Sequence, residues 1–164
     1  MISQTVRPAA IRNPLEQVTQ IRRWRCARIT MRSGKLVGIE RRWFVGSVSM
    51  AQVWWQSRYG RPDDDYCWLD YHTPLGMPAF LTLDYIHSGR TAGYKTFVGA
   101  CHVLDEVARI RNACAIVAHV STSAITDRLL LRLGWERHLE NRSGRHWIKR
   151  FYDGYPESSL DRYL

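Results

Sequence analysis

The segment with the clearest chemical potential runs from Asp84 to Lys95, where an aromatic-rich extended stretch passes through a loop with glycines at 89 and 93 into a helix start. Backbone N–H groups in the first turn of a helix have no partner within the helix, and the helix dipole adds partial positive charge there. Glycine lets an anion approach the backbone, and Arg90 and Lys95 add full positive charge. This pattern is typical of a phosphate-binding loop, although it fits equally well a turn that uses glycine only to begin the helix.

Two ionisable side chains near the ends of neighbouring extended segments are candidates for a general base. His119 follows an apolar run, and an imidazole with an unperturbed pKa of about 6.5 can take a proton from an amine near neutral pH. Asp84 is the second candidate, because ligands of open α/β sheets bind at strand ends. Each has a structural alternative: a buried imidazole hydrogen-bonded to backbone for His119, and a partner for an arginine in the case of Asp84.

The hydrophobic pattern predicts the elements that position these residues. Residues 66–72 and 79–87 are typical of an antiparallel hairpin around a turn rich in Pro and Gly. Residues 97–110 repeat apolar side chains with a helical period. Asp105 is predicted to pair with Arg109 on the side of this helix that carries no apolar stripe. Residues 114–120 are almost uninterrupted apolar sequence, as expected for a strand in a parallel pair. Strand, helix and strand together predict a β-α-β crossover.

The remaining segments carry weaker signals. Residues 13–16 combine an N-cap side chain, a proline and a glutamate, which predicts a helix that runs toward the turn at 33–34 unless residues 29–31 are already extended. Residues 35–44 alternate like a strand, and residues 49–59 have the capping order of a short helix.

Two further elements close the chain. Ser121, Thr122 and Ser123 are predicted to cap a second helix that ends at Gly134. A final hairpin is predicted over residues 135–140 and 145–152. The sequence contains no internal repeat, which favours one mixed α/β domain.

In this order, residues 65–152 resemble the second half of the GNAT acyltransferase superfamily. In that family a strand leads into a loop with Arg or Gln, two residues, Gly, one residue and then Gly or Ala, whose amides hold the pyrophosphate of acetyl-coenzyme A. Arg90 and Gly93 match the first and central positions, whereas Lys95 replaces the final small residue. Leu133-Gly134-Trp135 resembles the junction before the last two strands of the family.

The resemblance implies a fold and a domain organisation. We expect an α/β, or α+β mixed-sheet, GNAT-like structure: a central and mostly antiparallel sheet with one parallel β-α-β crossover and flanking helices. A single GNAT-like domain then spans residues 1–164, with a loose N-terminal segment over 1–12 and a C-terminal tail over 153–164.

The resemblance also implies an activity, the transfer of acetyl from acetyl-CoA, the acyl-donor co-substrate, to the amine of a small molecule or a peptide. Family members often carry a tyrosine that protonates the departing thiolate, but Leu130 stands there in this chain and cannot donate a proton. His119 and Asp84 therefore remain the catalytic candidates, with a non-catalytic domain as the alternative. The expected coenzyme-binding residues are Tyr85, Arg90, Thr91, Ala92, Gly93, Tyr94, Lys95 and Ser123.

The charge balance keeps a second class of function open. The net charge is +9, and of 24 basic residues only Lys35, Lys95 and Lys149 are lysines. A polyanionic partner is a natural explanation. The basic residues are scattered rather than gathered in one block, which favours solvated arginines over a nucleic-acid surface. A module on the same scaffold that binds nucleic acid or another acidic partner is the alternative to the acyltransferase.

Cysteine and apolar patterns limit the environment. The four cysteines are widely spaced without a CxxC pair, so we expect reduced thiols and no metal site. The acidic residues 63–65 are more typical of a solvated loop than of a cation site. With no run of about 18 apolar residues and no signal-peptide pattern at the start, we expect a cytoplasmic protein that does not span a membrane.

Overall fold

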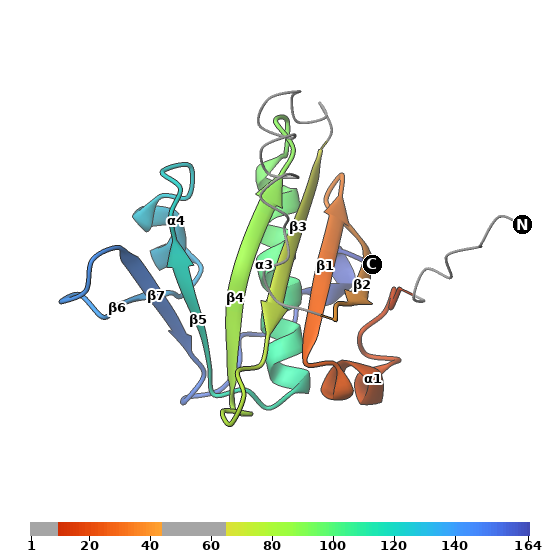
Figure 1. The fold of residues 1–164 in the computed structure, drawn as a ribbon. Helices are drawn as coiled ribbons and strands as arrows, with labels where there is room; N and C mark the ends of the chain where they lie inside the picture. The colour runs from red at the N-terminus through yellow and green to blue at the C-terminus, as the bar shows by residue number, and fades with distance from the viewer. Residues whose placement is uncertain (1–9, 44–64) are drawn as a thin grey trace, which may run out of the picture.

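The computed structural model describes residues 10–43 and 65–164. Within them the chain forms an α+β fold around a seven-stranded mixed sheet, ordered β2-β1-β3-β4-β5-β7-β6, in which only β4 and β5 pair in parallel (Figure 1). The expected class, a mostly antiparallel sheet with one parallel pair and flanking helices, is confirmed. The elements are α1 (Val18–Arg23), β1 (Cys26–Arg32), β2 (Lys35–Arg41), β3 (Tyr66–His72), β4 (Phe80–Ser88), α3 (Tyr94–Ile110), β5 (Ala115–Val120), α4 (Asp127–Arg132), β6 (Glu136–His138), β7 (Arg145–Arg150) and the 3-10 turn η1 (Leu160–Arg162).

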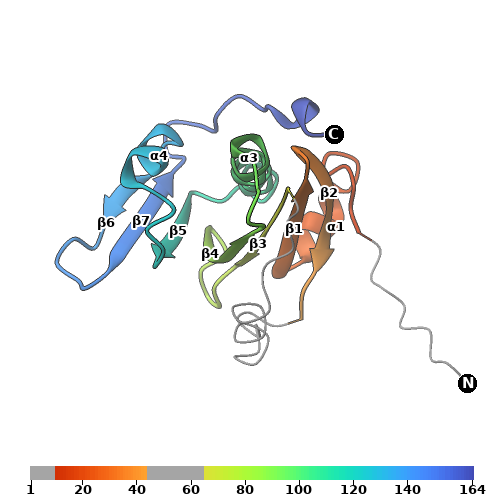
Figure 2. The ribbon, with the colours of Figure 1, turned by 90° about the horizontal axis from the view of Figure 1, so that it is seen from above.

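The two faces of the sheet differ. Helices α3 and α4 and the C-terminal stretch lie on one face (Figure 2). There Val103 and Val107 of α3 join Ile29 of β1 and Leu69 of β3 in the core, all fully buried. Burying such a side chain contributes about 1.5–3 kcal/mol relative to leaving it in water. The alternate residues of β3, Trp68 among them, point to the other side and are only partly buried. In the described part of the chain, α3 and α4 lie on the opposite side from Trp68, and we call the side of Trp68 the open face.

Strands β3 and β4 form the predicted hairpin, but a bulge interrupts their pairing. Asp70 pairs with Tyr85 and Tyr71 pairs with Leu83, so Asp84 has no opposite residue in β3. An extra residue of this kind bends the strand and redirects a side chain. The bulge therefore singles out one of the residues proposed from the sequence as a catalytic candidate.

Helix α3 follows the predicted helical period, but its predicted surface ion pair is wrong. Asp105 bonds to Lys149 of β7 at 2.7 Å instead of pairing with Arg109. Arg109 bonds instead to Glu106. Asp105 is buried, and a buried carboxylate needs a cation inside the fold more than an exposed carboxylate does. The helix ends before Asn112, which adopts a φ of 54°.

The N-terminal helix is shorter than the sequence predicts. The Asn13 side chain accepts a hydrogen bond from the Leu15 amide at 3.1 Å and donates one to Glu16 at 2.9 Å. These bonds close a turn, and α1 begins only after it and ends at Arg23. From Cys26 the chain pairs with β2 and β3 on its two sides, so the alternative of an already extended segment holds. Tertiary pairing overrides the local helix signal here.

The start of α4 is also displaced from its predicted cap. Thr126, rather than residues 121–123, caps the helix, and its hydroxyl accepts a hydrogen bond from the Leu129 amide at 3.2 Å. Gly134 follows the helix with a φ of 81°, which only glycine adopts without cost. The final hairpin, β6 and β7, then forms as predicted.

The described ends of the chain pack against the core. Ile11, expected in a loose segment, is fully buried and forms a bridge with Ile39. In the C-terminal tail, Leu160 and Tyr163 are buried as well. The tail is therefore part of the fold.

Some predictions concern residues outside the described ranges. The helix predicted over 49–59 and the acidic residues 63 and 64 lie there, whereas the strand predicted over 35–44 is β2. Among the described helices, none has the length and apolar character needed to cross a membrane.

Candidate functional site

The sheet opens where its two parallel strands part. The pairing of β4 with β5 ends at Leu83 and Ala118. The next residue in β4 is Asp84, and the next in β5 is His119. Both catalytic candidates are thus the first residues beyond the last parallel pair. Unpaired strand edges at such a point leave backbone N–H and C=O groups available to a ligand.

Asp84 lies on the open face and is bound to a histidine. The Nδ1 atom of His72 is 2.8 Å from both carboxylate oxygens, and the two side chains are 18% and 13% exposed. Burial raises the pKa of Asp84, although the hydrogen bond and the charge of His72 oppose this. The carboxylate is therefore more basic than an exposed one. The expected alternative, an arginine partner for Asp84, is wrong because the partner is His72.

His119 is exposed, so the alternative of a buried imidazole is wrong. Its neighbours Ala118 and Val120 are buried, which places His119 on the open face. Directly across in β7 lies His146, and the two rings stack with centroids 4.7 Å apart and an angle of 18° between their planes. His146 in turn pairs with His138 of β6. Three histidines thus form a row across β5, β7 and β6.

A mostly apolar cavity of about 250 Å³ adjoins this row. Thr82, beside His72 in the sheet, lines it together with His119 and His146. Trp147 also lines it, and its indole N–H has no hydrogen-bond partner in the described part of the chain. The other lining residues are Val117, Ala118, His138 and Leu139.

Three of these site residues, His72, His146 and His138, were not identified from the sequence. Each becomes part of the site through cross-strand register rather than through a motif. His138 and His146 lie on either side of the last hairpin turn, which was the available signal for their pairing. Among the described residues, no group of three or more His, Cys, Asp or Glu side chains is arranged to hold a metal ion. Stacked rings direct their lone pairs in parallel rather than at one point.

The predicted phosphate loop is already occupied by a side chain. The Gly93 amide donates a hydrogen bond to Asp65 at 2.8 Å. This bond, with another from Thr96, lowers the pKa of Asp65. The carboxylate therefore takes the place at the start of α3 that an anion was expected to take. Around it, Arg90, Thr91, Tyr94 and Lys95 are exposed, and Ala92 is partly buried.

Two other expected coenzyme contacts lie apart from this loop. Tyr85 belongs to an aromatic cluster on the open face, with its ring centroid 5.3 Å from that of Trp68. Arg28 lies over the same Trp68 ring at 3.6 Å and also bonds to Asp70. Ser123 is exposed in the loop before α4.

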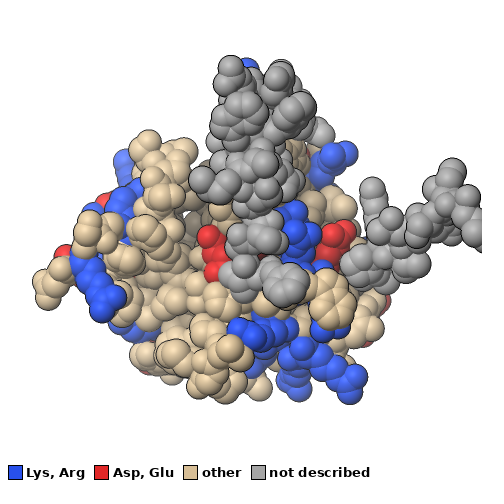
Figure 3. Space-filling view, in the orientation of Figure 1, with Lys and Arg blue, Asp and Glu red and all other residues tan. Residues whose placement is uncertain are grey.

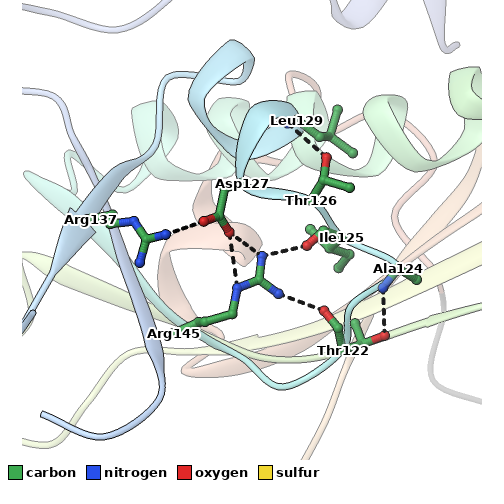
Figure 4. A network of polar contacts seen from close by, with 8 residues as sticks. All are labelled: Thr122, Ala124, Ile125, Thr126, Asp127, Leu129, Arg137 and Arg145. Atoms are coloured by element: carbon green, nitrogen blue, oxygen red, sulfur yellow. Dashed lines mark hydrogen bonds and ion pairs between the residues drawn. The ribbon is translucent and has the colours of Figure 1, made fainter.

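A polar network fixes the loop that contains Ser123. Arg145 of β7 donates hydrogen bonds to the carbonyl groups of Thr122, at 2.8 Å, and Ile125, at 2.6 Å (Figure 4). Its guanidinium also pairs with Asp127, which binds Arg137 through its other oxygen. These bonds hold the loop, which turns at residues 123 and 124, in a non-helical conformation, and α4 starts only after Thr126. Ser123 takes no part in the network.

No protein-family model, curated protein or solved structure matches this chain significantly. The residues and the topology thus carry the functional argument.

The opening between β4 and β5 can support proton transfer. An exposed imidazole lies on one side and a carboxylate paired with a second imidazole lies on the other. Leu130, which the sequence resemblance places at the position of a family tyrosine, is 6% exposed and belongs to the core. Among the described residues, Asp84, His72 and His119 are the acid–base groups nearest the last parallel pair.

Proposed function

We propose that this protein is an acyl-CoA-dependent N-acyltransferase of GNAT type, which transfers an acyl group, acetyl in the simplest case, to an amine. One observation carries the proposal: Asp84 and His119 each follow the last parallel pair, and both lie on the open face. An extended thioester arm fits an unpaired strand edge, because the edge offers main-chain hydrogen bonds. The acceptor amine then lies close to groups that can take its proton.

The proposed reaction needs one base. The amine nitrogen attacks the thioester carbonyl carbon, and the C–N bond forms as the C–S bond breaks. The proton from the nitrogen passes to the imidazole of His119, with the Asp84–His72 pair as the second acceptor. The coenzyme leaves as a thiolate, which is tolerable without an acid because a thiol has a pKa of about 8.5. Leu130 in the core is therefore compatible with turnover.

Binding of acetyl-CoA is the first test of the proposal. A ligand that binds only the folded state at a hundredfold excess over its Kd stabilises the protein by about 2.7 kcal/mol. We expect acetyl-CoA and desulfo-CoA to raise the melting temperature in a thermal-shift assay. The variant Arg90→Gln should weaken this shift, and Arg142→Gln, an exposed arginine in the last hairpin loop, should not. The absence of any shift at millimolar coenzyme would contradict the proposal.

The contact between Asp65 and Gly93 leads to a second expected result. Replacing Asp65 with alanine removes an N-terminal cap of α3, so the free energy of unfolding should fall by about 1 kcal/mol at neutral pH. The folded-state pKa of Asp65 is lowered, so its stabilisation is present above about pH 4 and is lost as the pH falls through that folded-state pKa. Urea denaturation of both proteins at several pH values measures the difference.

The same variant tests the phosphate loop. If the Gly93 amide receives a coenzyme phosphate, Asp65→Ala should bind acetyl-CoA more tightly than the unchanged protein. Weaker binding would mean that the phosphates contact other groups. Asp65→Asn keeps an acceptor oxygen and removes only the charge, so it separates repulsion from simple occupation of the amide.

The alternative, a nucleic-acid-binding module, has less support. On the visible part of the open face the Lys and Arg side chains lie in separate groups, with acidic residues between some of them (Figure 3). A nucleic-acid surface is expected to present a continuous basic patch. A tight complex that survives physiological salt and discriminates between sequences would reverse this preference, because nonspecific charge contacts weaken steeply with salt.

A further inference from the structure

A large cavity lies on the helix-covered face of the sheet, away from the opening between β4 and β5. Its volume is about 510 Å³, within the range of small-ligand sites. It lies between the second half of α3, the end of α4, Lys149 of β7 and the C-terminal stretch from Pro156 to Arg162. Figure 2 shows this stretch crossing over α3. We call this space the tail cavity.

The tail cavity contains a concentration of buried charge. Asp105, Glu106 and Lys149 line it and are 8%, 4% and 8% exposed. They are the only buried acidic, lysine or arginine side chains among the described residues. Ion pairs taken out of water cost free energy that apolar residues of similar size would not. Their concentration around one cavity therefore favours a functional role.

The buried acids are already neutralised. Asp105 bonds to Lys149 at 2.7 Å, and Glu106 bonds to Arg109. Carboxylates engaged in this way are poor ligands for a cation. His102 also lines the cavity, and burial, with the nearby Lys149 and Arg162, lowers its pKa and so disfavours its charged form.

Unpaired cations remain at the rim. Arg132 at the end of α4 and Arg162 in the C-terminal stretch line the cavity, and neither forms an ion pair with a described residue. Of the carboxylates that line the cavity, only that of Glu157 forms no ion pair with a described residue. Ser158 and Ser159 add hydroxyl groups. A guanidinium binds planar and tetrahedral oxyanions through paired N–H groups.

The wall of the tail cavity is anchored. Tyr163 and Ser159 hydrogen-bond to Nδ1 of His102, at 2.8 and 3.1 Å, and Leu160 is buried in the core. The amide of Leu36 donates to the carbonyl of Tyr163 at 2.7 Å. A ligand would therefore meet a preformed site, which reduces the entropy lost on binding.

We propose that the tail cavity is a second binding site, independent of acyl transfer, for a small oxyanion such as a phosphate ester or a polycarboxylate, held by Arg132 and Arg162. The two arginines approach from different elements, so both are needed. Each should strengthen binding roughly tenfold, as expected for a charge-assisted hydrogen bond.

The test compares two charge-matched double variants of the full chain. Pyrophosphate and citrate are titrated into the unchanged protein, Arg132→Gln/Arg162→Gln and Arg128→Gln/Arg142→Gln, with melting temperature and calorimetric Kd as readouts. Arg128 and Arg142 are exposed and lie outside the cavity. We expect binding to the unchanged protein and the control variant, and a loss of roughly a hundredfold in the first variant.

The outcomes distinguish the ligand classes. Binding of pyrophosphate alone assigns a phosphate ester, and binding of citrate alone assigns a carboxylate. No binding of either, or equal binding by both double variants, overturns the proposal. Arg132→Lys keeps the positive charge but loses the paired N–H groups of the guanidinium. This variant should therefore bind the anion more weakly even where folding is unchanged. Because these variants leave Arg90 in place, their acetyl-CoA shift should persist.

Discussion

Replacing His119 with alanine is expected to lower kcat for acyl transfer by about 10²–10⁴-fold, the usual contribution of a positioned acid or base. The ring is exposed at the opening beyond Ala118, so its loss should leave the fold and the affinity for acetyl-CoA nearly unchanged. The rate of free thiol release at saturating acetyl-CoA and amine measures the effect. Equal losses in kcat and kcat/KM would place the missing interaction in the transition state.

Two controls separate proton transfer from packing. Added imidazole should restore part of the rate to His119→Ala if the missing group is a base. Asp84→Asn tests the second acceptor, and it should act mainly on kcat because His72 can still hydrogen-bond to the amide oxygen. Full activity in both variants with a confirmed acceptor would place the base elsewhere. Binding of acetyl-CoA without any acceptor would identify a binding domain in place of an enzyme.

The elements of the fold that follow one uninterrupted pattern were predictable. The helical repeat from Phe97 matches α3, and the apolar run before His119 matches β5. Helix-capping patterns gave a wrong helix start where contacts with distant residues set the local backbone conformation. The stretch 121–125 is held in a non-helical loop by Arg145, which lies twenty or more residues further along the chain from Thr122 and Ile125, the two residues whose carbonyl groups it binds. No local cap preference competes with such a network.

Only two residues of the candidate site could be predicted from the sequence. Asp84 and His119 could be proposed because strand ends bind ligands, but the partners His72 and His146 depend on register. A bulge at Asp84 has no sequence signal. The position of Asp65 at the Gly93 amide, 28 residues away, is likewise a tertiary fact, and it changes what the glycine loop can bind.

Breaking the buried pair between β7 and α3 should have the largest effect on stability. We expect Lys149→Met to lower the free energy of unfolding by about 3–5 kcal/mol, because it leaves Asp105 buried without its cation. Lys35→Met, at an exposed lysine, should cost less than about 1 kcal/mol. The double variant Lys149→Met/Asp105→Leu should recover most of the loss, since no isolated charge remains. Urea denaturation of the unchanged protein, Lys149→Met, Asp105→Leu and the double variant measures the coupling between the two positions.

The pH dependence of the single variant checks the cause. Burial already raises the pKa of Asp105, and Lys149 opposes that rise, so removing the lysine should raise the pKa further. A carboxyl group with a raised folded-state pKa costs stability as the pH rises from its unfolded value, about 3.9, through its folded value. The deficit of Lys149→Met should therefore shrink as the pH is lowered toward the unfolded-state value, because protonation of Asp105 removes its buried charge. A deficit that stays constant with pH would instead attribute the loss to packing of the lysine chain, and the Asp105→Leu double variant would then fail to restore it.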